Sequence, residues 1–314
     1  MGLLRISIVI PAFNAGSYIS QCLESILSQD YDAWEAIVGN DGSTDNTADV
    51  VRMFAARDAR IRLLDLAHIG WPNAVRAECV MASSFEYVVL LDADDYIEAG
   101  FLRKICRRWT ETGADFVGAK SFYINEEGRT LRQIPSEDFN SDVLLDGKEA
   151  LSLVIYDWQF ALTGGLWRKE LFLRENSWYK DKQLCPDEYE LRLTIRSCSL
   201  VAFSDAVYFY RVYGTSFSQA RSWKLLKAQM TTDSLLLSLC AREYGYGSDK
   251  WGRTYLGLAS WTKCALRYYH DNRKKLKRNE RREMRKVLCS SLKNLADFRA
   301  IPILWQKACG RILM

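Results

Sequence analysis

Hydrophobic and polar positions in the first hundred residues alternate between two patterns. Short runs rich in Ile, Val and Leu, typical of buried strands, cover residues 4–11, 34–39, 61–66 and 88–91. Stretches with apolar residues at helical spacing lie at 18–27, at 45–55 and after Trp71. Because strand and helix alternate four times, the pattern predicts an α/β fold, a doubly wound parallel sheet with helices on both faces.

Polar residues follow three of the apolar runs. The clusters are Pro11–Asn14, Asn40–Gly42 and Asp92–Asp95. Ser43 and Thr44 are the expected N-caps of the helix at 45–55. In open α/β sheets ligands bind at the carboxyl ends of the strands, so we expect the three clusters to converge on one site.

Three carboxylates end the apolar run VVLLDADDY at 88–96: Asp92, Asp94 and Asp95. Carboxylates beside a hydrophobic core are costly unless they are neutralised, and oxygen ligands suit Mg²⁺ or Mn²⁺. Such a cation commonly carries a phosphate. The alternative is an acidic turn that caps a helix beginning near Ile97.

The segments IVIPAFNAGSYISQCLESILSQ, NDGSTDNT and LLDADDY resemble, in order and spacing, the start of a family 2 glycosyltransferase, bacterial envelope polysaccharide type. The similarity runs from about Ile6 to about Ser218. It implies a GT-A (Rossmann-like) doubly wound mixed sheet. It also implies inverting transfer of a sugar from a nucleotide diphosphate donor, with UDP favoured, to a hydroxyl of a glycan or lipid-linked acceptor, assisted by Mn²⁺ or Mg²⁺.

The resemblance also implies roles for individual residues. Pro11, Ala12 and Asn14 correspond to the loop beside the base and ribose. Asp41 corresponds to the carboxylate that reads the base. The run Asp92, Ala93, Asp94 corresponds to the donor-contacting motif, with Asp92 at the ribose and Asp94 on the metal. Arg76 resembles an arginine that faces the nucleotide, the alternative being an exposed helix arginine paired with Glu78 or Asp92. Arg211 is a candidate phosphate contact. Asn40 stands where Asp is commoner, which we interpret as tolerated variation.

Direct displacement also requires a base that removes the proton of the acceptor hydroxyl. The family places it in a Glu-Asp pair at a helix start, and the matching stretch here is Cys185-Pro-Asp-Glu-Tyr, with the acids reversed. Glu188 is favoured by register, and Asp187 is the alternative. Acids in a first helical turn are stabilised by the helix dipole whatever their role, so neither assignment is secured by position alone.

Charge divides the chain. Residues 221–314 carry 21 Lys plus Arg against 7 Asp plus Glu, whereas residues 1–220 carry 22 against 32. We therefore expect a catalytic domain at 1–220 and a basic C-terminal helical extension at 221–314. Its pattern predicts helices at 223–244, 250–270, 275–295 and 303–313. Basic amphipathic helices bind anionic membrane surfaces, here the inner leaflet; the alternative is a solvated basic face that packs on a partner.

Composition limits the remaining classes. The nine cysteines include no C-x-x-C pair, and His68 and His270 are isolated, which disfavours zinc, disulfides and a histidine nucleophile. No apolar stretch has the length of a membrane span, and no signal peptide is expected. The scattered cysteines indicate a reducing cytoplasm, and the basic helices indicate a peripheral membrane location. A homo-oligomer is compatible with the pattern. The competing functions are an inactive sugar-nucleotide-binding scaffold and a nucleic-acid binder; the latter leaves Asp41, Asp92 and Asp94 unexplained.

Overall fold

The computed structural model describes residues 4–137, 139–155, 160–174, 189–213 and 222–295. These residues form two compact units, a sheet with its covering helices and a helical C-terminal unit. The expected boundary between residues 220 and 221 lies outside the described residues and stays a prediction. Each unit is described by itself.

A mixed sheet is the framework of the first unit. Its strands among the described residues are β1 (Ile6–Ala12), β2 (Trp34–Asn40), β3 (Ile61–Asp65), β4 (Tyr87–Leu90), β5 (Tyr96–Ile97), β6 (Phe116–Ile124), β7 (Thr130–Ile134), β8 (Leu166–Arg168) and β9 (Val201–Arg211). Their order is β3-β2-β1-β4-β8-β6-β9-β5, with β7 paired to β6. The four strands predicted from the apolar runs are the parallel half, β3-β2-β1-β4. Antiparallel pairing of β8 with β4 makes the sheet mixed.

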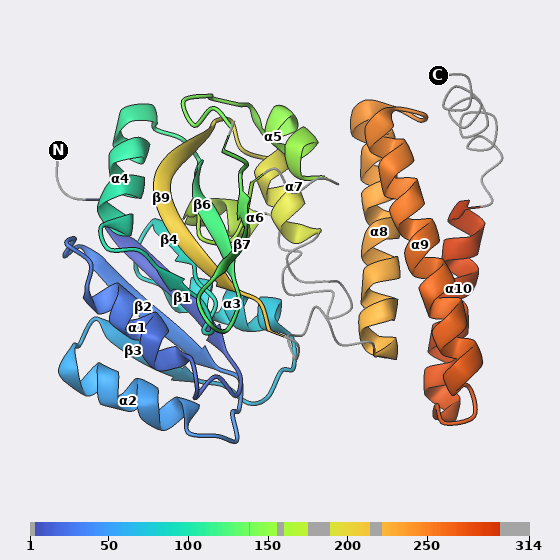
Figure 1. Ribbon diagram of the computed structural model, residues 1–314, viewed down its shortest axis with the longest axis horizontal. Coiled ribbons are helices and arrows are strands. Elements are labelled where there is room, and N and C mark those ends of the chain that lie inside the picture. Colours follow the sequence, from blue (N-terminus) through green and yellow to red (C-terminus); the bar gives the residue numbers. More distant parts are fainter. Residues whose placement is uncertain (1–3, 138, 156–159, 175–188, 214–221, 296–314) are drawn as a thin grey trace. The chain divides into compact units, whose positions relative to one another are not determined.

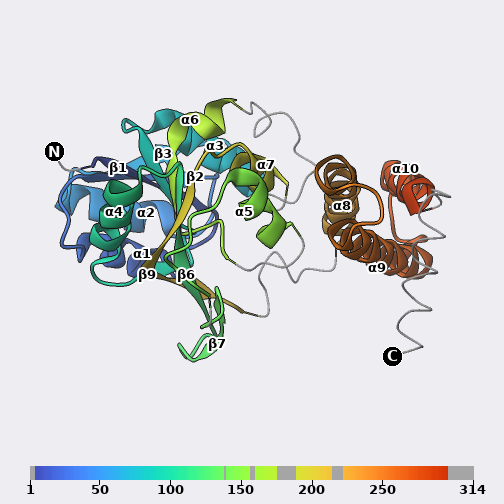
Figure 2. The ribbon, with the colours of Figure 1, turned by 90° about the horizontal axis from the view of Figure 1, so that it is seen from above.

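Helices cover both faces of this sheet (Figures 1 and 2). They are α1 (Ile19–Leu27), α2 (Thr47–Arg57), α3 (Pro72–Ala82), α4 (Phe101–Thr112), α5 (Gly147–Val154), α6 (Lys169–Arg174) and α7 (Glu190–Arg196). Alternate residues of β1, Ile6, Ile8 and Ile10, share one core with α1, α2 and α4. On the other face α3 packs so closely that a Cβ on Gly39 would lie 2.8 Å from a methyl of Val75. The α/β prediction is confirmed.

Helix α2 begins later than predicted, so the assignment of Ser43 and Thr44 as its N-caps is wrong. The helix begins at Thr47, whose backbone N–H donates to Asp45 Oδ1 at 3.0 Å. Ser43 Oγ instead accepts the backbone N–H of Asn14 at 2.9 Å. A carboxylate is a stronger acceptor than a hydroxyl, which is consistent with Asp45 accepting the N–H at the helix start while Ser43 accepts an N–H of the neighbouring loop.

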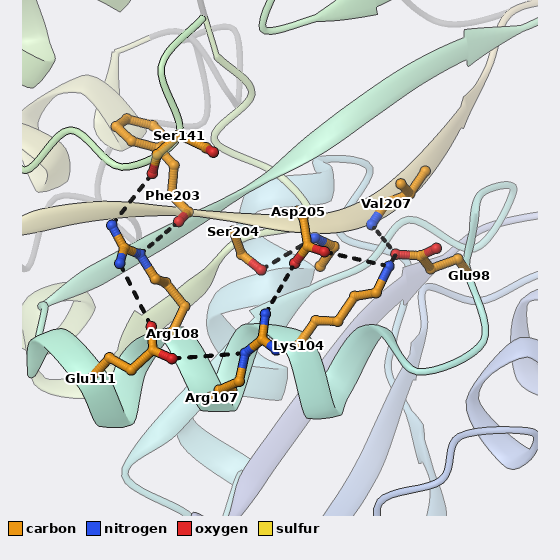
Figure 3. A network of polar contacts seen from close by, with 11 residues as sticks. Glu98, Lys104, Arg107, Arg108, Glu111, Ser141, Phe203, Ser204, Asp205 and Val207 are labelled. Carbon is orange, nitrogen blue, oxygen red and sulfur yellow. Dashed lines mark hydrogen bonds and ion pairs between the residues drawn. The ribbon is translucent and has the colours of Figure 1, made fainter.

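Polar contacts join α4 to β9 (Figure 3). Arg108 Nε donates to the Phe203 carbonyl at 2.9 Å. Glu98 Oε1 accepts both Lys104 Nζ and the Val207 backbone N–H at 2.7 Å. These contacts fix the strand that ends at Arg211, close to the acidic turn described below.

The second unit contains α8 (Trp223–Tyr244), α9 (Asp249–Asn272) and α10 (Arg278–Leu295). The predictions at 223–244, 250–270 and 275–295 agree with these bounds to within three residues, whereas 303–313 lies outside the described residues. Met284 and Leu288 of α10 are buried, and Lys227 of α8 pairs with Glu283 of α10 at 2.9 Å. Within the described residues, none of the helices combines the length and apolar character needed to cross a membrane.

Candidate active site

The carboxyl ends of β2, β1 and β4 lie next to one another in the sheet, which brings the three polar clusters to one edge. Ala12 is in register with Asn40, and the Asp41 backbone N–H donates to the Ala12 carbonyl at 2.8 Å. On the other side of β1, the Leu91 N–H donates to the Val9 carbonyl at 3.1 Å. Parallel pairing thus produces the convergence predicted from the strand ends.

Asp41 is buried, with 4% of its surface exposed, and its carboxylate holds a loop. The backbone N–H groups of Ile69 and Gly70 donate to its two oxygens at 2.5 and 2.9 Å. His68 Nδ1 lies 2.8 Å from the Asp41 carbonyl oxygen. His68, isolated in the sequence, is therefore part of this edge. Two backbone donors, with His68 Nδ1 3.3 Å from Oδ2, occupy about three of the roughly four acceptor positions of a carboxylate, which leaves capacity for one further N–H.

The loop after β1 is cross-linked to the loop after β2. Pro11 and Ala12 are the last residues of β1, and Asn14 follows with a positive φ of 50°. Asn14 Oδ1 accepts the Thr44 backbone N–H at 2.8 Å. Phe13, which lies between Ala12 and Asn14 in the sequence, is 49% exposed, and its ring centroid lies 4.7 Å from that of His68. Sequence reasoning missed this aromatic pair; the available signal was a Phe inside the polar cluster Pro11–Asn14.

Asn40 links β2 to β3. Its Nδ2 donates to Asp65 Oδ1 at 2.8 Å, and its Oδ1 accepts the Ser43 N–H at 3.2 Å. The hydrogen bond from Asn40, together with the Arg52 guanidinium, lowers the pKa of Asp65 despite partial burial. The Asn40 amide is therefore used as both donor and acceptor, so this residue has a specific structural role in addition to being a tolerated variation.

Arg76 is 2% exposed, so the alternative of an exposed helix arginine is wrong. Its guanidinium donates to Asp92 Oδ1 at 2.5 Å and to Asn73 Oδ1 at 3.1 Å. The pairing with Asp92 weighed from the sequence is present, but it is a largely desolvated pair at the sheet edge. Such a pair is costly to break, because the remaining charge is left without its partner.

The three carboxylates after β4 have different surroundings. Asp92 binds Arg76; Asp94 Oδ2 accepts the Tyr213 hydroxyl at 2.7 Å. Asp95 is 2% exposed and accepts the Tyr208 hydroxyl at 2.5 Å. Ala93 between them is buried. Burial, and then the charges of Asp94 and Asp92, raise the pKa of Asp95 well above its usual range.

The acidic turn is not a helix cap, so that alternative is wrong. Tyr96 and Ile97 form the short strand β5, and α4 begins at Phe101 after Gly100, without a side-chain cap. A glycine in the left-handed conformation, φ 79°, separates the acids from the helix start. The carboxylates therefore have no role at a helix N-terminus.

A divalent cation fits this edge through Asp94. Burial, followed by the charge of Asp92, raises the pKa of Asp94, so its carboxylate lies where positive charge is favourable. The described residues contain no group of three or more His, Cys, Asp or Glu arranged to hold a metal ion. One carboxylate with substrate phosphates and water is nevertheless an ordinary binding mode for Mg²⁺.

Arg211 ends β9 beside the acidic turn and is largely buried. Its Nε donates to the Asp94 carbonyl at 2.9 Å, and its terminal nitrogen donates to Gln21 Oε1 at 2.6 Å. Tyr208 and Tyr213, which lie on or just after the same strand, contact Asp95 and Asp94. Neither tyrosine was singled out from the sequence. The two candidate bases, Asp187 and Glu188, lie outside the described residues, so their assignment stays a prediction.

Known proteins resemble the chain at the level of family and fold. The model of the family described as Glycosyl transferase family 2 matches residues 7–167, just over half of the chain. GlyG, a glycosyltransferase of Streptococcus pneumoniae, is 28% identical over 214 residues, 66% of this chain and 70% of GlyG. YibD, an uncharacterized glycosyltransferase of Escherichia coli, is 27% identical over 175 residues, 55% of this chain and about half, 51%, of YibD.

Two solved structures share the fold. The crystal structure of Staphylococcus aureus TarS 1-349 in complex with UDP-GlcNAc has a TM-score of 0.63 and 18% identity, covering 94% of this chain and 83% of that one. The mannosyltransferase PcManGT of Pyrobaculum calidifontis, in complex with GDP-Man and Mn²⁺, has a TM-score of 0.51 and 15% identity, covering 94% and 88%.

Proposed function

The chain belongs to glycosyl transferase family 2 and is a glycosyltransferase, and from this premise we propose that it transfers a sugar from a nucleoside diphosphate donor to a hydroxyl group. One observation carries the proposal. Asp41, the Arg76–Asp92 pair and Asp94 lie at the adjoining carboxyl ends of β2, β1 and β4. This is the edge at which a sheet of this type binds a nucleotide.

A UDP-sugar is the proposed donor. The TarS structure that shares this fold was determined with UDP-GlcNAc, and the mannosyltransferase with GDP-Man. The remaining acceptor capacity of Asp41 suits the imide N–H of uracil. The exposed face of Phe13, beside His68, supplies an aromatic surface next to it for the base. Pro11, Ala12 and Asn14 would lie beside the base and ribose, with Asp92 at the ribose.

Mn²⁺ or Mg²⁺ is the proposed cofactor; Asp94 would hold it, and it would stabilise the charge of the departing nucleoside diphosphate. The protein's own residues set the local charge. Arg76 offsets Asp92, so one net negative carboxylate, Asp94, faces the cation rather than two. Ala93 separates the two acids along the turn. Arg211 is a further cationic group beside the diphosphate, although its described contacts anchor it to Asp94 and Gln21.

The acceptor hydroxyl attacks the anomeric carbon as its proton passes to a carboxylate, with inversion at that carbon. Glu188 is the proposed base and Asp187 the alternative. In this step the bond from the sugar to the diphosphate breaks while the bond to the acceptor oxygen forms, and the carboxylate receives the proton. If Glu188 is the base, Glu188→Gln should lose sugar transfer; if Asp187 is the base, Asp187→Asn should lose it.

A glycan or lipid-linked acceptor of a bacterial envelope polysaccharide is proposed, with the protein in the cytoplasm and peripheral on the inner membrane face. The support is the basic surface of the second unit. All ten Lys and Arg between residues 273 and 293 are exposed: Arg273, Lys274, Lys275, Lys277, Arg278, Arg281, Arg282, Arg285, Lys286 and Lys293. Anionic lipid attracts such clusters by about 1 kcal/mol per basic residue.

The proposal is tested by a thermal-shift screen of UDP- and GDP-sugars with and without Mn²⁺. A donor that binds only the native state at 100 times its Kd stabilises by about 2.7 kcal/mol. The expected result is a Mn²⁺-dependent shift that Asp94→Ala removes, followed by slow Mn²⁺-dependent donor hydrolysis that Glu188→Gln weakens. A Mn²⁺-linked shift with no hydrolysis and no transfer to any acceptor would favour an inactive scaffold. No shift with any nucleotide sugar would contradict the proposal.

A further inference from the structure

Asp94 belongs to a closed ring of contacts, which it enters through both its carboxylate and its backbone carbonyl. Tyr213 donates its hydroxyl to Asp94 Oδ2 at 2.7 Å, and its ring stacks on Tyr18 at a centroid distance of 5.5 Å and an interplanar angle of 23°. The Arg211 guanidinium carbon lies 5.0 Å from the centre of the Tyr18 ring. Arg211 in turn donates to the Asp94 carbonyl and to Gln21 Oε1. The ring joins α1, the turn after β4 and the end of β9.

We propose that Tyr213 is a positioning residue that orients the Asp94 carboxylate for a divalent cation. The inference rests on the proposed function, in which Asp94 carries the cation. It adds a residue that neither the sequence motifs nor the acidic turn identifies. Tyr213 itself does not touch the donor or the reacting atoms in this account, and it acts through Asp94 alone.

Asp94 needs such support because its neighbours are committed elsewhere. Asp92 faces Arg76, and Asp95 accepts the Tyr208 hydroxyl and the Arg211 backbone N–H. Among the described residues, the turn therefore offers one carboxylate to the cation. With a single protein ligand, the direction of that carboxylate determines where the cation lies relative to the diphosphate. Partners that hydrogen-bond a ligand typically change metal affinity 10- to 100-fold when they are removed.

The contacts of Tyr213 favour orientation over competition with the cation. A carboxylate oxygen has two lone pairs, so Asp94 accepts the hydroxyl and retains capacity for a metal. The phenol ring is fixed by Tyr18, and Tyr18 is the residue directly before α1. The Tyr213 hydroxyl is therefore preorganised, because its ring stacks on a residue at the start of a helix. This is the arrangement expected of a residue that orients a metal ligand.

The experiment compares Mn²⁺ binding to wild type, Tyr213→Phe, Tyr18→Phe and Tyr18→Ala, with Asp94→Ala as reference. Free Mn²⁺ is measured by electron paramagnetic resonance, with Mn²⁺ alone and with Mn²⁺ plus UDP. Tyr213→Phe keeps the ring and removes the hydroxyl, so Mn²⁺ affinity falls about 10- to 100-fold. Tyr18→Phe keeps the stack and binds Mn²⁺ as wild type does. Tyr18→Ala removes the stack and weakens binding as Tyr213→Phe does.

A second readout separates positioning from general loss of structure. In Tyr213→Phe the Mn²⁺ concentration giving half-maximal activity rises, while the rate at saturating Mn²⁺ stays within about threefold of wild type, since the defect lies in metal affinity. Unchanged or tighter Mn²⁺ binding by Tyr213→Phe, with binding lost in Asp94→Ala, overturns the inference alone. Equal Mn²⁺ binding by wild type and Asp94→Ala overturns the proposed cation site as well.

Discussion

Asn40 shows how much a single side chain adds to the predicted motif. The sequence indicated a missing negative charge, because Asp is commoner at this position in the family. In the structure Asn40 Nδ2 donates to Asp65 Oδ1, and no carboxylate can do so when both groups are ionised. Asp65 also pairs with Arg52 at 3.0 Å. The amide thus matches Asp65, a partner that is 25 residues away and that the motif alone does not reveal.

Asn40→Asp is expected to lower the free energy of unfolding by about 1–3 kcal/mol at pH 7, because two carboxylates would face each other at hydrogen-bond distance. The loss should shrink as pH falls below about 4, where one carboxyl group is protonated and donates again. Chemical denaturation at pH 7 and pH 4 measures this difference. Asn40→Ala is the control: it removes the amide without adding a charge, so its loss at pH 7 should be smaller than that of Asn40→Asp. Because it also removes a hydrogen bond that lowers the pKa of Asp65, part of that loss should disappear at low pH. An equal loss for Asn40→Asp at both pH values would contradict the argument.

Glu35, in β2 at the end of the sheet opposite the site, is a carboxylate whose negative charge is expected to stabilise the fold. Burial alone would raise its pKa, but hydrogen bonds from the Ser84 backbone, Ser7, the Ser84 hydroxyl and Arg62 outweigh burial, so the pKa is lowered. A group with a lowered pKa in the folded state contributes stability above its ordinary pKa and loses it as pH falls through the folded value. Its contribution is therefore present at neutral pH.

Glu35→Gln should accordingly be less stable than wild type by about 1–3 kcal/mol at pH 7. The difference should diminish below about pH 4.5, as the wild-type carboxylate becomes protonated. Urea unfolding of both proteins between pH 7 and pH 3.5 gives the comparison. A difference that is the same at both ends of the range would show that the charge of Glu35 contributes nothing.

At the scale of elements, strand ends were predictable and the contacts between distant elements were not. The apolar runs predicted β1 to β4 and the edge at which Asp41 and Asp92 meet, because parallel strands align their carboxyl ends. Tyr208 and Tyr213 reach Asp95 and Asp94 across 113 and 119 residues of chain. Their contacts depend on β9 joining the far side of the sheet, and no local periodicity reports that pairing.

The segment before β8 also contacts residues that are distant in the sequence. Gly164 has φ 73°, and its N–H donates to the Leu90 carbonyl at 2.9 Å. A Cβ at this position would lie 2.5 Å from the Tyr208 ring. No local sequence pattern reveals the tyrosine that Gly164 accommodates.

Gly164→Ala is expected to destabilise the protein by about 2–5 kcal/mol, the sum of left-handed strain and overpacking against Tyr208. Gly128→Ala is a matched control. Gly128 has φ 78°, and among the described residues no atom lies within 4 Å of its added Cβ, so strain of about 1–2 kcal/mol acts alone. Thermal and urea unfolding compare the two variants. Equal losses of stability in the two variants would show that Tyr208 shifts away from the added methyl group without a measurable free-energy penalty.

On the scale of the whole molecule, charge divides the chain into an acidic part and a basic part. The described residues 222–295 carry 17 Lys plus Arg against 6 Asp plus Glu, although the net charge of the chain is only +4. Helix α10 keeps Met284 and Leu288 buried and its basic residues exposed. The sequence predicted this amphipathic pattern, since apolar residues recur at helical spacing between the charges. What the surface binds is a matter of charge complementarity, and anionic lipid is the proposed partner.

Replacing Arg278, Arg281 and Arg282 by Gln is expected to weaken binding to vesicles that contain anionic lipid. At about 1 kcal/mol for each residue, the loss is about 3 kcal/mol, or roughly 100-fold in partition coefficient at low salt. The same three residues replaced by Lys form the matched control, because charge is kept and binding should stay near wild type. Neutral vesicles should bind none of the proteins. Sedimentation of vesicles at two salt concentrations measures all three, and equal binding of the Gln and Lys variants would contradict a lipid-binding role. Donor hydrolysis in solution should be the same in both variants, since none of the three arginines is a proposed donor-site residue.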